Sequence, residues 1–285
     1  MKLIAIDLDG TLLSHEKNIH PEDIKAINDA LALGVQVIVA TGRHYQDAKK
    51  MISKFGLNLP IVGSNGASIH DLQGNLLKIL GIEQPDLIHV FTDLEQFDIA
   101  FLALGEQHVY TTHRSLDIMA EEVEIFKTPE FETDMYRIQQ ELRLMVEEKE
   151  GLIYKTAKEM ALVGDRVLNI LAVSYDAKKR LEGKAHFEAQ TRLHVFSSYR
   201  NNFEMTHPEV SKGHSVKFYA NRLGIKDYEI VAIGDNYNDV SMLKMAGIGV
   251  AMGNAEEGVK AISDFVTLDN HDGGVGYAIR KLLFL

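Results

Sequence analysis

The stretch Lys2-Leu-Ile-Ala-Ile-Asp7-Leu-Asp9-Gly10-Thr11 decides the fold that we expect for this chain. Its first part is a short continuous apolar run, which is typical of a strand buried on both faces of a parallel sheet. Side chains two positions apart in an extended strand face the same way, so Asp7 and Asp9 should converge at the end of this strand. Gly10 permits a sharp turn there. We therefore expect a buried first strand that carries two carboxylates at its carboxyl end.

Strands and helices alternate on both sides of this stretch. Pro21 near a helix start and Gly34 just past its end delimit the first helix. The predicted helices of these two parts cover residues 20–31, 45–55, 214–223, 240–245, 256–262 and 276–283. The predicted strands cover residues 2–7, 35–40, 61–62, 230–233, 248–251 and 265–267. Such alternation at both ends of the chain predicts an α/β fold with a doubly wound parallel sheet.

The middle of the chain has a different pattern. Its predicted helices cover residues 85–94, 133–148 and 177–190, and its predicted strands cover residues 98–104, 107–111, 167–173 and 193–196. Two of these strands flank Gly105-Glu106 and predict a hairpin, so this second sheet should be antiparallel. We therefore predict an α+β domain over residues 82–197, inserted into a core formed by residues 1–81 and 198–285.

Composition excludes several classes of protein. The 285 residues are 46% hydrophobic, enough to bury sizeable cores, and they include no Cys, which excludes disulfides, thiolate nucleophiles and Cys-ligated metals. The net charge of −11 repels nucleic acid and anionic lipid at long range. No apolar run approaches the roughly 20 residues of a membrane span. The charged residue Asp7 lies where the apolar region of a secretory signal would be. We expect a cytoplasmic protein that binds neither nucleic acid nor membrane.

Three further motifs lie at the ends of predicted strands or the starts of helices. Thr41-Gly42-Arg43 precedes a helix, where it forms either an anion site or an ordinary helix cap. Ser64-Asn65-Gly66 by itself is a turn. Lys212 lies at a helix start, where a lysine opposes the helix dipole, so it is either solvated or faces a phosphate.

A fourth motif, Gly234-Asp235-Asn236-Tyr237-Asn238-Asp239, follows a buried strand and opens a helix. Its side chains, together with those of Asp7 and Asp9, offer hard oxygen ligands. Such ligands favour the binding of Mg²⁺ over the binding of zinc or copper. Two neighbouring carboxylates also repel each other unless a cation or proton separates them. Taken alone, Asp7-Leu-Asp9-Gly10 is explained equally well by a turn that ends a strand.

Together and in this order, the motifs Asp7-Leu-Asp9-Gly-Thr, Thr41-Gly-Arg, Lys212 and Gly-Asp235-Asn-Tyr-Asn-Asp239 resemble the haloacid dehalogenase superfamily of aspartyl-phosphate enzymes. Within it the chain resembles the Cof-like phosphatases, which carry a large α/β cap inserted between the second and third motifs. This resemblance implies a Rossmann-like core, a cap that contacts the leaving group, Mg²⁺ as cofactor and a small phosphate monoester as substrate.

The resemblance also implies a role for individual residues. Asp7 would be the nucleophile, and Asp9 the acid that protonates the leaving group and the base that activates water. The implied metal-site residues are Asp7, Asp9, Asp235 and Asn236. The implied phosphate-binding groups are the Leu8 backbone, Thr41, Gly42, Lys212 and Asn238. The supporting residues would be Arg43, Asn65 and Asp239, with Asp239 orienting Lys212 or the metal shell.

Two other functions stay open at this point. A phosphomutase of the same superfamily would return the phosphoryl group to its substrate, and a sensor on the same fold would bind phosphorylated ligands without turnover. His44, and Tyr110, His113 and Arg114 in the inserted domain, are either substrate contacts or ordinary positions. The physiological substrate, the residues of the cap that select it, and the oligomeric state are not predicted.

Overall fold

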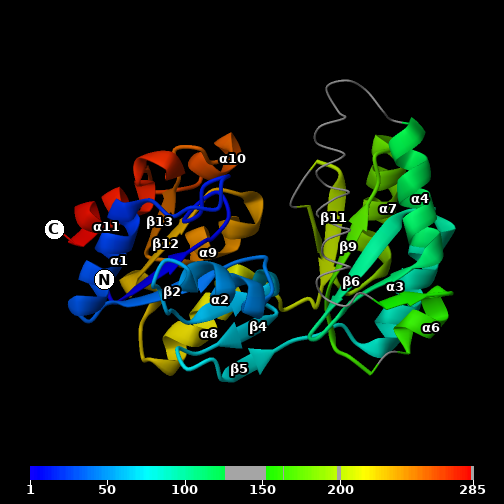
Figure 1. The fold of residues 1–285 in the computed structure, drawn as a ribbon, viewed down its shortest axis with the longest axis horizontal. Coiled ribbons are helices and arrows are strands. Elements are labelled where there is room, and N and C mark those ends of the chain that lie inside the picture. The colour runs from blue at the N-terminus through cyan, green and yellow to red at the C-terminus, as the bar shows by residue number, and fades with distance from the viewer. Residues whose placement is uncertain (126–151, 163, 198–199, 284–285) are drawn as a thin grey trace. The chain divides into compact units, whose positions relative to one another are not determined.

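The structure is a computed structural model that describes residues 1–125, 152–162, 164–197 and 200–283. The chain forms two compact units, one of residues 1–79 with 209–285 and one of residues 80–208 (Figure 1). Within the described part of the chain, no helix combines the length and the apolar character needed to cross a bilayer. Each unit has its own sheet, and each is described separately below.

The first unit is built on an eight-stranded sheet with the order β14-β13-β12-β1-β2-β3-β4-β5. The strands are β1 (Leu3–Ile6), β2 (Gln36–Ala40), β3 (Ile61–Gly63), β4 (Ser68–His70), β5 (Leu76–Ile79), β12 (Ile230–Gly234), β13 (Ile248–Ala251) and β14 (Phe265–Val266). All strand pairs from β14 to β3 are parallel, and β4 and β5 add an antiparallel edge. The predicted parallel sheet is therefore a mixed one, because a hairpin of β4 and β5 extends it.

Helices pack on this sheet in pairs. They are α1 (Pro21–Ala32), α2 (Tyr45–Ser53), α8 (Lys212–Arg222), α9 (Val240–Met245), α10 (Glu257–Lys260) and α11 (Gly274–Leu283). Helix α1 packs beside α11, and α8 packs beside α9 (Figure 1). The chain runs from β1 towards β3 in one direction along the sheet and from β12 towards β14 in the other. Because crossovers between parallel strands are right-handed as a rule, the helices of these two series belong on opposite faces of the sheet.

Strand β1 lies at the point where the strand order reverses, between β12 and β2. All four of its residues are buried, as expected for a central parallel strand. In open α/β sheets, ligands bind beyond the carboxyl ends of the strands at this reversal. The residues that follow β1, β2, β3 and β12 therefore share one edge of the sheet.

The second unit has a six-stranded sheet with the order β10-β11-β9-β6-β7-β8. Its strands are β6 (Ala100–Gly105), β7 (Val109–Thr112), β8 (Leu152–Tyr154), β9 (Val167–Val173), β10 (His194–Phe196) and β11 (Asn202–Thr206). Its helices are α3 (Gln84–Gln96), α4 (His113–Ile125), α6 (Ala157–Ala161) and α7 (Ala177–Gln190). The pairs are antiparallel except β7 with β8, and its core includes the buried rings of Phe91, Phe101, Phe187 and Phe203.

The structure corrects the predicted second boundary of the insertion. Residues from 198 onward were assigned to the core, but β11 pairs with β9 and β10, so the second unit continues to Pro208. Its first residue is Leu80 rather than Ile82. The residues from His113 to Ile125 form helix α4. The helix predicted over 133–148 lies outside the described residues.

Candidate active site

Three carboxylates gather at the sheet edge predicted from the sequence. Asp7 directly follows β1, Asp235 directly follows β12, and Asp239 ends the short 3₁₀ turn η3 (Tyr237–Asp239). The Asp7 amide donates to the Ile233 carbonyl at 3.0 Å, which ties the ends of the two strands together. One carboxylate oxygen from each of the three residues lies within 4.8 Å of the others. Strand pairing therefore brings residues more than 200 positions apart into one acidic group.

Lys212 is the counter-charge of this group. It is the first residue of α8, whose N-cap Ser211 accepts a hydrogen bond from the His214 amide. Its side chain is 1% exposed, and Nζ lies 2.6 Å from both Asp7 Oδ1 and Asp239 Oδ1. Burial lowers the pKa of Lys212, but the two carboxylates outweigh it and raise this pKa above its ordinary value. Lys212 is thus a buried ammonium that faces the candidate nucleophile, and not a solvated lysine.

The acidic group carries more negative charge than Lys212 alone neutralises. Burial raises the pKa of Asp7 well above its ordinary value, and repulsion by Asp239 adds to this effect. Burial, followed by repulsion from Asp239, raises the pKa of Asp235 to about 6, although Thr11 Oγ1 donates a hydrogen bond to Asp235 Oδ1 at 2.6 Å. Closely spaced buried carboxylates of this kind fit a divalent cation with oxygen ligands.

Asp239 is held by its own loop. Its Oδ2 accepts hydrogen bonds from the amides of Asp235 and Asn236, each at 3.0 Å, while Oδ1 accepts from Lys212. The side chain of Asn236 accepts from the amide of Tyr237 at 2.7 Å. Asp239 therefore orients both Lys212 and the loop of Asp235, and Asn236 caps the η3 turn. That Asn236 contributes to a metal site stays a prediction.

Asp9 lies apart from the three-carboxylate group. Arg43 Nε is 2.5 Å from Asp9 Oδ2, Arg43 Nη2 is 2.7 Å from Oδ1, and Lys17 Nζ is 2.8 Å from Oδ1. Burial raises the pKa of Asp9, but hydrogen bonds and charge from Arg43 and Lys17 outweigh it and lower this pKa. The structure thus pairs Asp9 with two cations, and that Asp9 contributes to a metal site stays a prediction. Lys17 was not singled out in the sequence.

The motifs after β2 and β3 meet the loop of Asp235. Thr41 Oγ1 accepts from the Arg43 amide at 3.1 Å, and the Thr41 carbonyl accepts from the Asn65 amide at 3.0 Å. Asn238 Nδ2 donates to Asn65 Oδ1 at 3.0 Å, which links this turn to η3. A Cβ on Gly42 would lie 3.2 Å from Asn65 Oδ1, so a side chain at this position would crowd Asn65.

Three other predicted positions have local contacts. Leu8 is buried, and its carbonyl accepts from the Leu13 amide at 2.7 Å. A phosphoryl oxygen needs a hydrogen-bond donor, so the Leu8 amide is the backbone group that could bind it. His44 is the N-cap of α2 and accepts from the Gln46 amide. Arg114 forms an exposed ion pair with Asp98 at 2.7 Å on the surface of the second unit. The last two contacts are those of ordinary structural positions.

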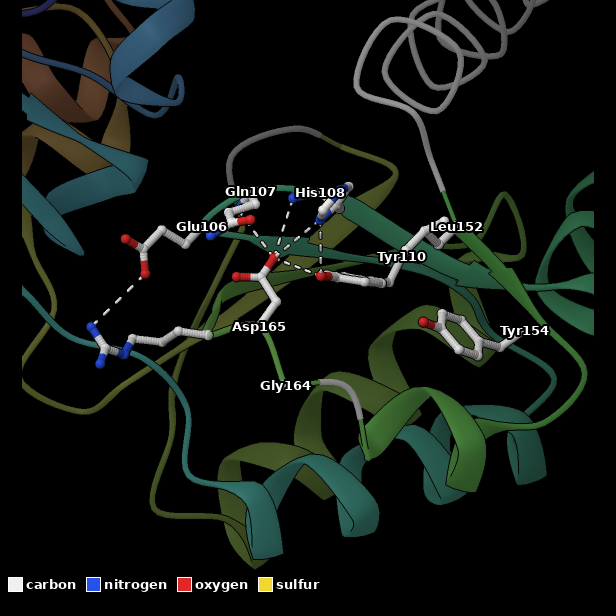
Figure 2. Close-up of a pocket in the computed structure, with 9 residues that line it drawn as sticks. Glu106, Gln107, His108, Tyr110, Leu152, Tyr154, Gly164 and Asp165 are labelled. Carbon is white, nitrogen blue, oxygen red and sulfur yellow. Dashed lines mark hydrogen bonds and ion pairs between the residues drawn. The ribbon is translucent and has the colours of Figure 1, made fainter.

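The second unit contains a pocket of about 650 Å³ beside the β6–β7 hairpin (Figure 2). Asp165 is nearly buried, and its Oδ2 accepts from Tyr110 Oη at 2.6 Å and from the amides of Gln107 and His108. Figure 2 shows the other oxygen of Asp165 turned away from these donors. Burial, then Asp165, raises the pKa of Tyr110, which keeps this phenol protonated. The Tyr154 ring also lines the pocket.

Comparisons with known proteins agree with this arrangement. A family model of haloacid dehalogenase-like hydrolases matches residues 4–279. The chain is 33% identical to Phosphatase YwpJ of Bacillus subtilis over 99% of this chain and 100% of that protein. It is 32% identical to the 5-amino-6-(5-phospho-D-ribitylamino)uracil phosphatase YwtE of Bacillus subtilis, over 99% of this chain and 98% of that protein.

A solved structure of a haloacid dehalogenase-like hydrolase from Bacillus subtilis superposes with a TM-score of 0.84 at 32% identity, over 99% of this chain and 100% of that one. The family match covers both units and every motif described above. The chain therefore belongs to the haloacid dehalogenase-like hydrolases, and it is a phosphatase of the Cof-like kind.

Proposed function

We propose that this phosphatase hydrolyses small phosphate monoesters, such as sugar phosphates or phosphorylated cofactors, through an aspartyl-phosphate on Asp7 with the help of Mg²⁺. The observation that carries the proposal is the buried contact of Lys212 with Asp7 and Asp239, with Asp235 beside them. A structural ion pair needs one carboxylate for one lysine. Here two carboxylates contact one ammonium and a third lies within 4.8 Å of both, which supports a site that also receives a cation.

The residues present fit a magnesium ion. Asp7 and Asp235 offer carboxylate oxygens, and burial together with repulsion from Asp239 raises the pKa values of both groups. Asp239 is already engaged by Lys212 and two amides, so it would orient the site without needing to bind the metal. When bound, Mg²⁺ would supply positive charge that offsets the repulsion between a carboxylate and a phosphate dianion.

In the first step an oxygen of Asp7 attacks phosphorus, and the bond from phosphorus to the leaving oxygen breaks. Lys212 offsets the negative charge on Asp7 and on the phosphoryl oxygens, while Thr41, Gly42 and Asn238 would contact those oxygens. Asp9 gives its proton to the leaving oxygen. A phosphate dianion beside Asp9 favours the protonated form of this acid, and it also offers Arg43 another acceptor.

In the second step Asp9, now a carboxylate, takes a proton from water as that water attacks phosphorus. The bond between phosphorus and Asp7 breaks, and inorganic phosphate leaves. Arg43 and Lys17 contact Asp9 and lower its pKa, so they keep it in the ionised form that can accept this proton and hold it in place. One residue thus serves as acid and then as base, and the covalent intermediate divides one difficult displacement into two easier ones.

We assign the choice of substrate to the inserted unit, residues 80–208, which would be the cap of this enzyme. The pocket at Asp165 supports the assignment, because it combines one available carboxylate oxygen with the Tyr110 and Tyr154 rings. Asp165→Asn should change the relative kcat/KM values of sugar phosphates but leave p-nitrophenyl phosphate hydrolysis unchanged. Asp117→Asn, at an exposed position of α4, is the matched control.

Release of inorganic phosphate from a broad panel of phosphate monoesters tests the function itself. With MgCl₂ the wild type should release phosphate, and EDTA should stop this release. Asp7→Asn should abolish turnover with the fold intact, because an amide of nearly equal volume is a poor nucleophile, whereas the exposed Asp227→Asn should retain it. Activity in Asp7→Asn, or full activity in EDTA, would contradict the proposal.

A further inference from the structure

The turn after β1 depends on the conformation of one glycine. Gly10 has φ of +85°, and it separates the candidate acid–base Asp9 from Thr11, which donates to Asp235. Glycine has the widest backbone freedom of any residue, so the directions of its two neighbours are not determined by local sterics. Within the turn, the Gly10 amide donates to the Leu13 carbonyl at 3.1 Å. The Leu12 and Leu13 amides also donate within the turn, to the Asp7 and Leu8 carbonyls at 3.3 Å and 2.7 Å. Contacts from outside the turn add to these restraints.

Asn254 provides one such contact from the loop that follows β13. Its Nδ2 donates to the Gly10 carbonyl at 2.7 Å, across 244 positions of sequence. Its Oδ1 accepts from the Asn270 amide at 3.1 Å. The two partners determine the orientation of the amide group, because a carbonyl needs the NH₂ end and an N–H needs the oxygen end.

Asn270 provides the second contact. It begins the 3₁₀ turn η4 (Asn270–Asp272), is 5% exposed, and donates from Nδ2 to the Leu13 carbonyl at 3.2 Å. This carbonyl is the acceptor for the Gly10 amide as well. The two asparagines therefore restrain both peptide groups that flank Gly10, one through Leu13 and one through the Gly10 carbonyl.

The loop of Asn254 is also bound to the strand end that carries Asp235. The Met252 amide donates to the Gly234 carbonyl and the Glu256 amide to the Asp235 carbonyl, each at 3.0 Å. Asn254 lies between these two anchors, with an exposed side chain. One short loop thus binds both the turn of Gly10 and the loop of Asp235, and it restrains their positions relative to each other.

We propose that Asn254 and Asn270 are positioning residues that keep Asp9 in place for proton transfer. The inference rests on the proposed function for the role of Asp9, whereas the restraint on the turn is a separate structural claim. Neither asparagine touches the three-carboxylate group in the described structure, so their effect should appear in proton transfer to the leaving group. Loss of the Gly10 contact should loosen the turn without unfolding the protein.

The test combines hydrogen exchange with the dependence of rate on the leaving group. In Asn254→Ala, amide exchange in peptides that cover residues 8–14 should be faster than in the wild type, with Tm within about 2 °C. On phenyl phosphate, whose leaving group has a pKa near that of tyrosine at about 10, kcat/KM should fall about tenfold, since a placed acid contributes roughly 10²–10⁴ to rate. On p-nitrophenyl phosphate, whose leaving group departs without a proton, kcat/KM should change less than about twofold.

Two further variants complete the design. Asn254→Asp keeps an acceptor for the Asn270 amide but loses the donor to the Gly10 carbonyl, so it should show the same leaving-group dependence. Asn221→Ala, at an exposed position of α8, should match the wild type in exchange and in both rates. Unchanged exchange over 8–14 would overturn the restraint. Faster exchange with equal losses on both substrates, or with none, would overturn the role in proton transfer. A wild type that hydrolyses neither substrate would refute the proposed function, and the exchange result would still decide the restraint.

Discussion

The ammonium of Lys212 lies 2.6 Å from the carboxylate of Asp7, although 205 positions separate them in the sequence. The whole second unit, residues 80–208, is inserted between the two. Their contact forms where α8 begins, beside the carboxyl end of β1. It is one of several buried contacts between the two halves of the first unit, together with the pairing of β1 with β12. The chemistry proposed for Asp7 depends on its contact with Lys212.

Removal of the buried ammonium should destabilise the fold more than removal of an exposed one. Lys212→Met leaves Asp7 and Asp239 buried without a counter-charge, and we expect a loss of about 3–5 kcal/mol in the free energy of unfolding. Lys217→Met on the same helix breaks an ion pair with Asp227 whose side chains are 45% and 42% exposed, and it should cost less than about 1 kcal/mol. Urea unfolding in EDTA measures both variants, and equal losses would contradict this account of Lys212.

Alanine variants of two glycines with positive φ should distinguish the effect of backbone strain from the effect of crowding in the site. Gly10 and Gly34 have φ of +85° and +81°, so Ala at either position should cost roughly 1 kcal/mol in stability. A Cβ on Gly10 would also meet the carboxylate of Asp235, whereas a Cβ on Gly34 meets nothing within 4 Å. Gly10→Ala alone should therefore lower kcat and raise the Mg²⁺ concentration needed for half-maximal activity. The same kinetic defect in Gly34→Ala would contradict this explanation.

Asp23 should make the stability of the first unit depend on pH. Its side chain is buried between α1 and α11, Oδ1 accepts from the Gly276 amide at 2.6 Å, and Oδ2 has no hydrogen-bond partner. Burial raises the pKa of Asp23 to about 6, against an ordinary value near 4. Between these values the folded state binds more protons than the unfolded state, so stability should fall as pH rises from about 4 to about 6, by ~2–3 kcal/mol.

Urea midpoints measured from pH 4 to pH 7 test this slope. Asp23→Asn cannot ionise and should remove about 2–3 kcal/mol of the decrease, whatever its absolute stability, while the raised pKa values of Asp7 and Asp235 account for the rest. Asp29→Asn, on the same helix at a position whose side chain is 42% exposed, should retain the wild-type slope. A wild-type slope in Asp23→Asn would rule out Asp23 as its source.

Much of the fold of the first unit could be predicted because its central strands are continuous apolar runs. Strands β1, β2, β12 and β13 are almost wholly buried, and such strands are visible in the sequence without knowledge of their neighbours. The strands β4 and β5 were missed because they are short and partly exposed, with His70 and Lys78 among their residues. The residues of β11 were not predicted as a strand and were placed in the core, because the Asn202-Phe-Glu-Met-Thr206 pattern does not indicate which sheet it joins.

The candidate site was predictable to the extent that parallel strands share an edge. That rule was enough to bring Asp7, Thr41 and Asp235 to one place. It did not show that Asp9 would turn to Arg43 and Lys17, because the direction of a side chain beyond a strand end depends on the turn that follows. Asn254 and Asn270 were missed for a related reason. They bind backbone carbonyls more than 240 positions away, and no local pattern records such a contact.

The account depends on Asp7 as the group that receives the phosphoryl group, and Asp9→Asn gives the most direct test. With p-nitrophenyl phosphate the first step needs no acid, but the second step lacks its base, so the phosphoenzyme should accumulate. Rapid mixing should show a burst of one p-nitrophenolate per active site. Mass spectrometry of the quenched protein should find one phosphoryl group on Asp7. A phosphoryl group on any other residue, or slow release with no burst and no modified protein, would contradict the account.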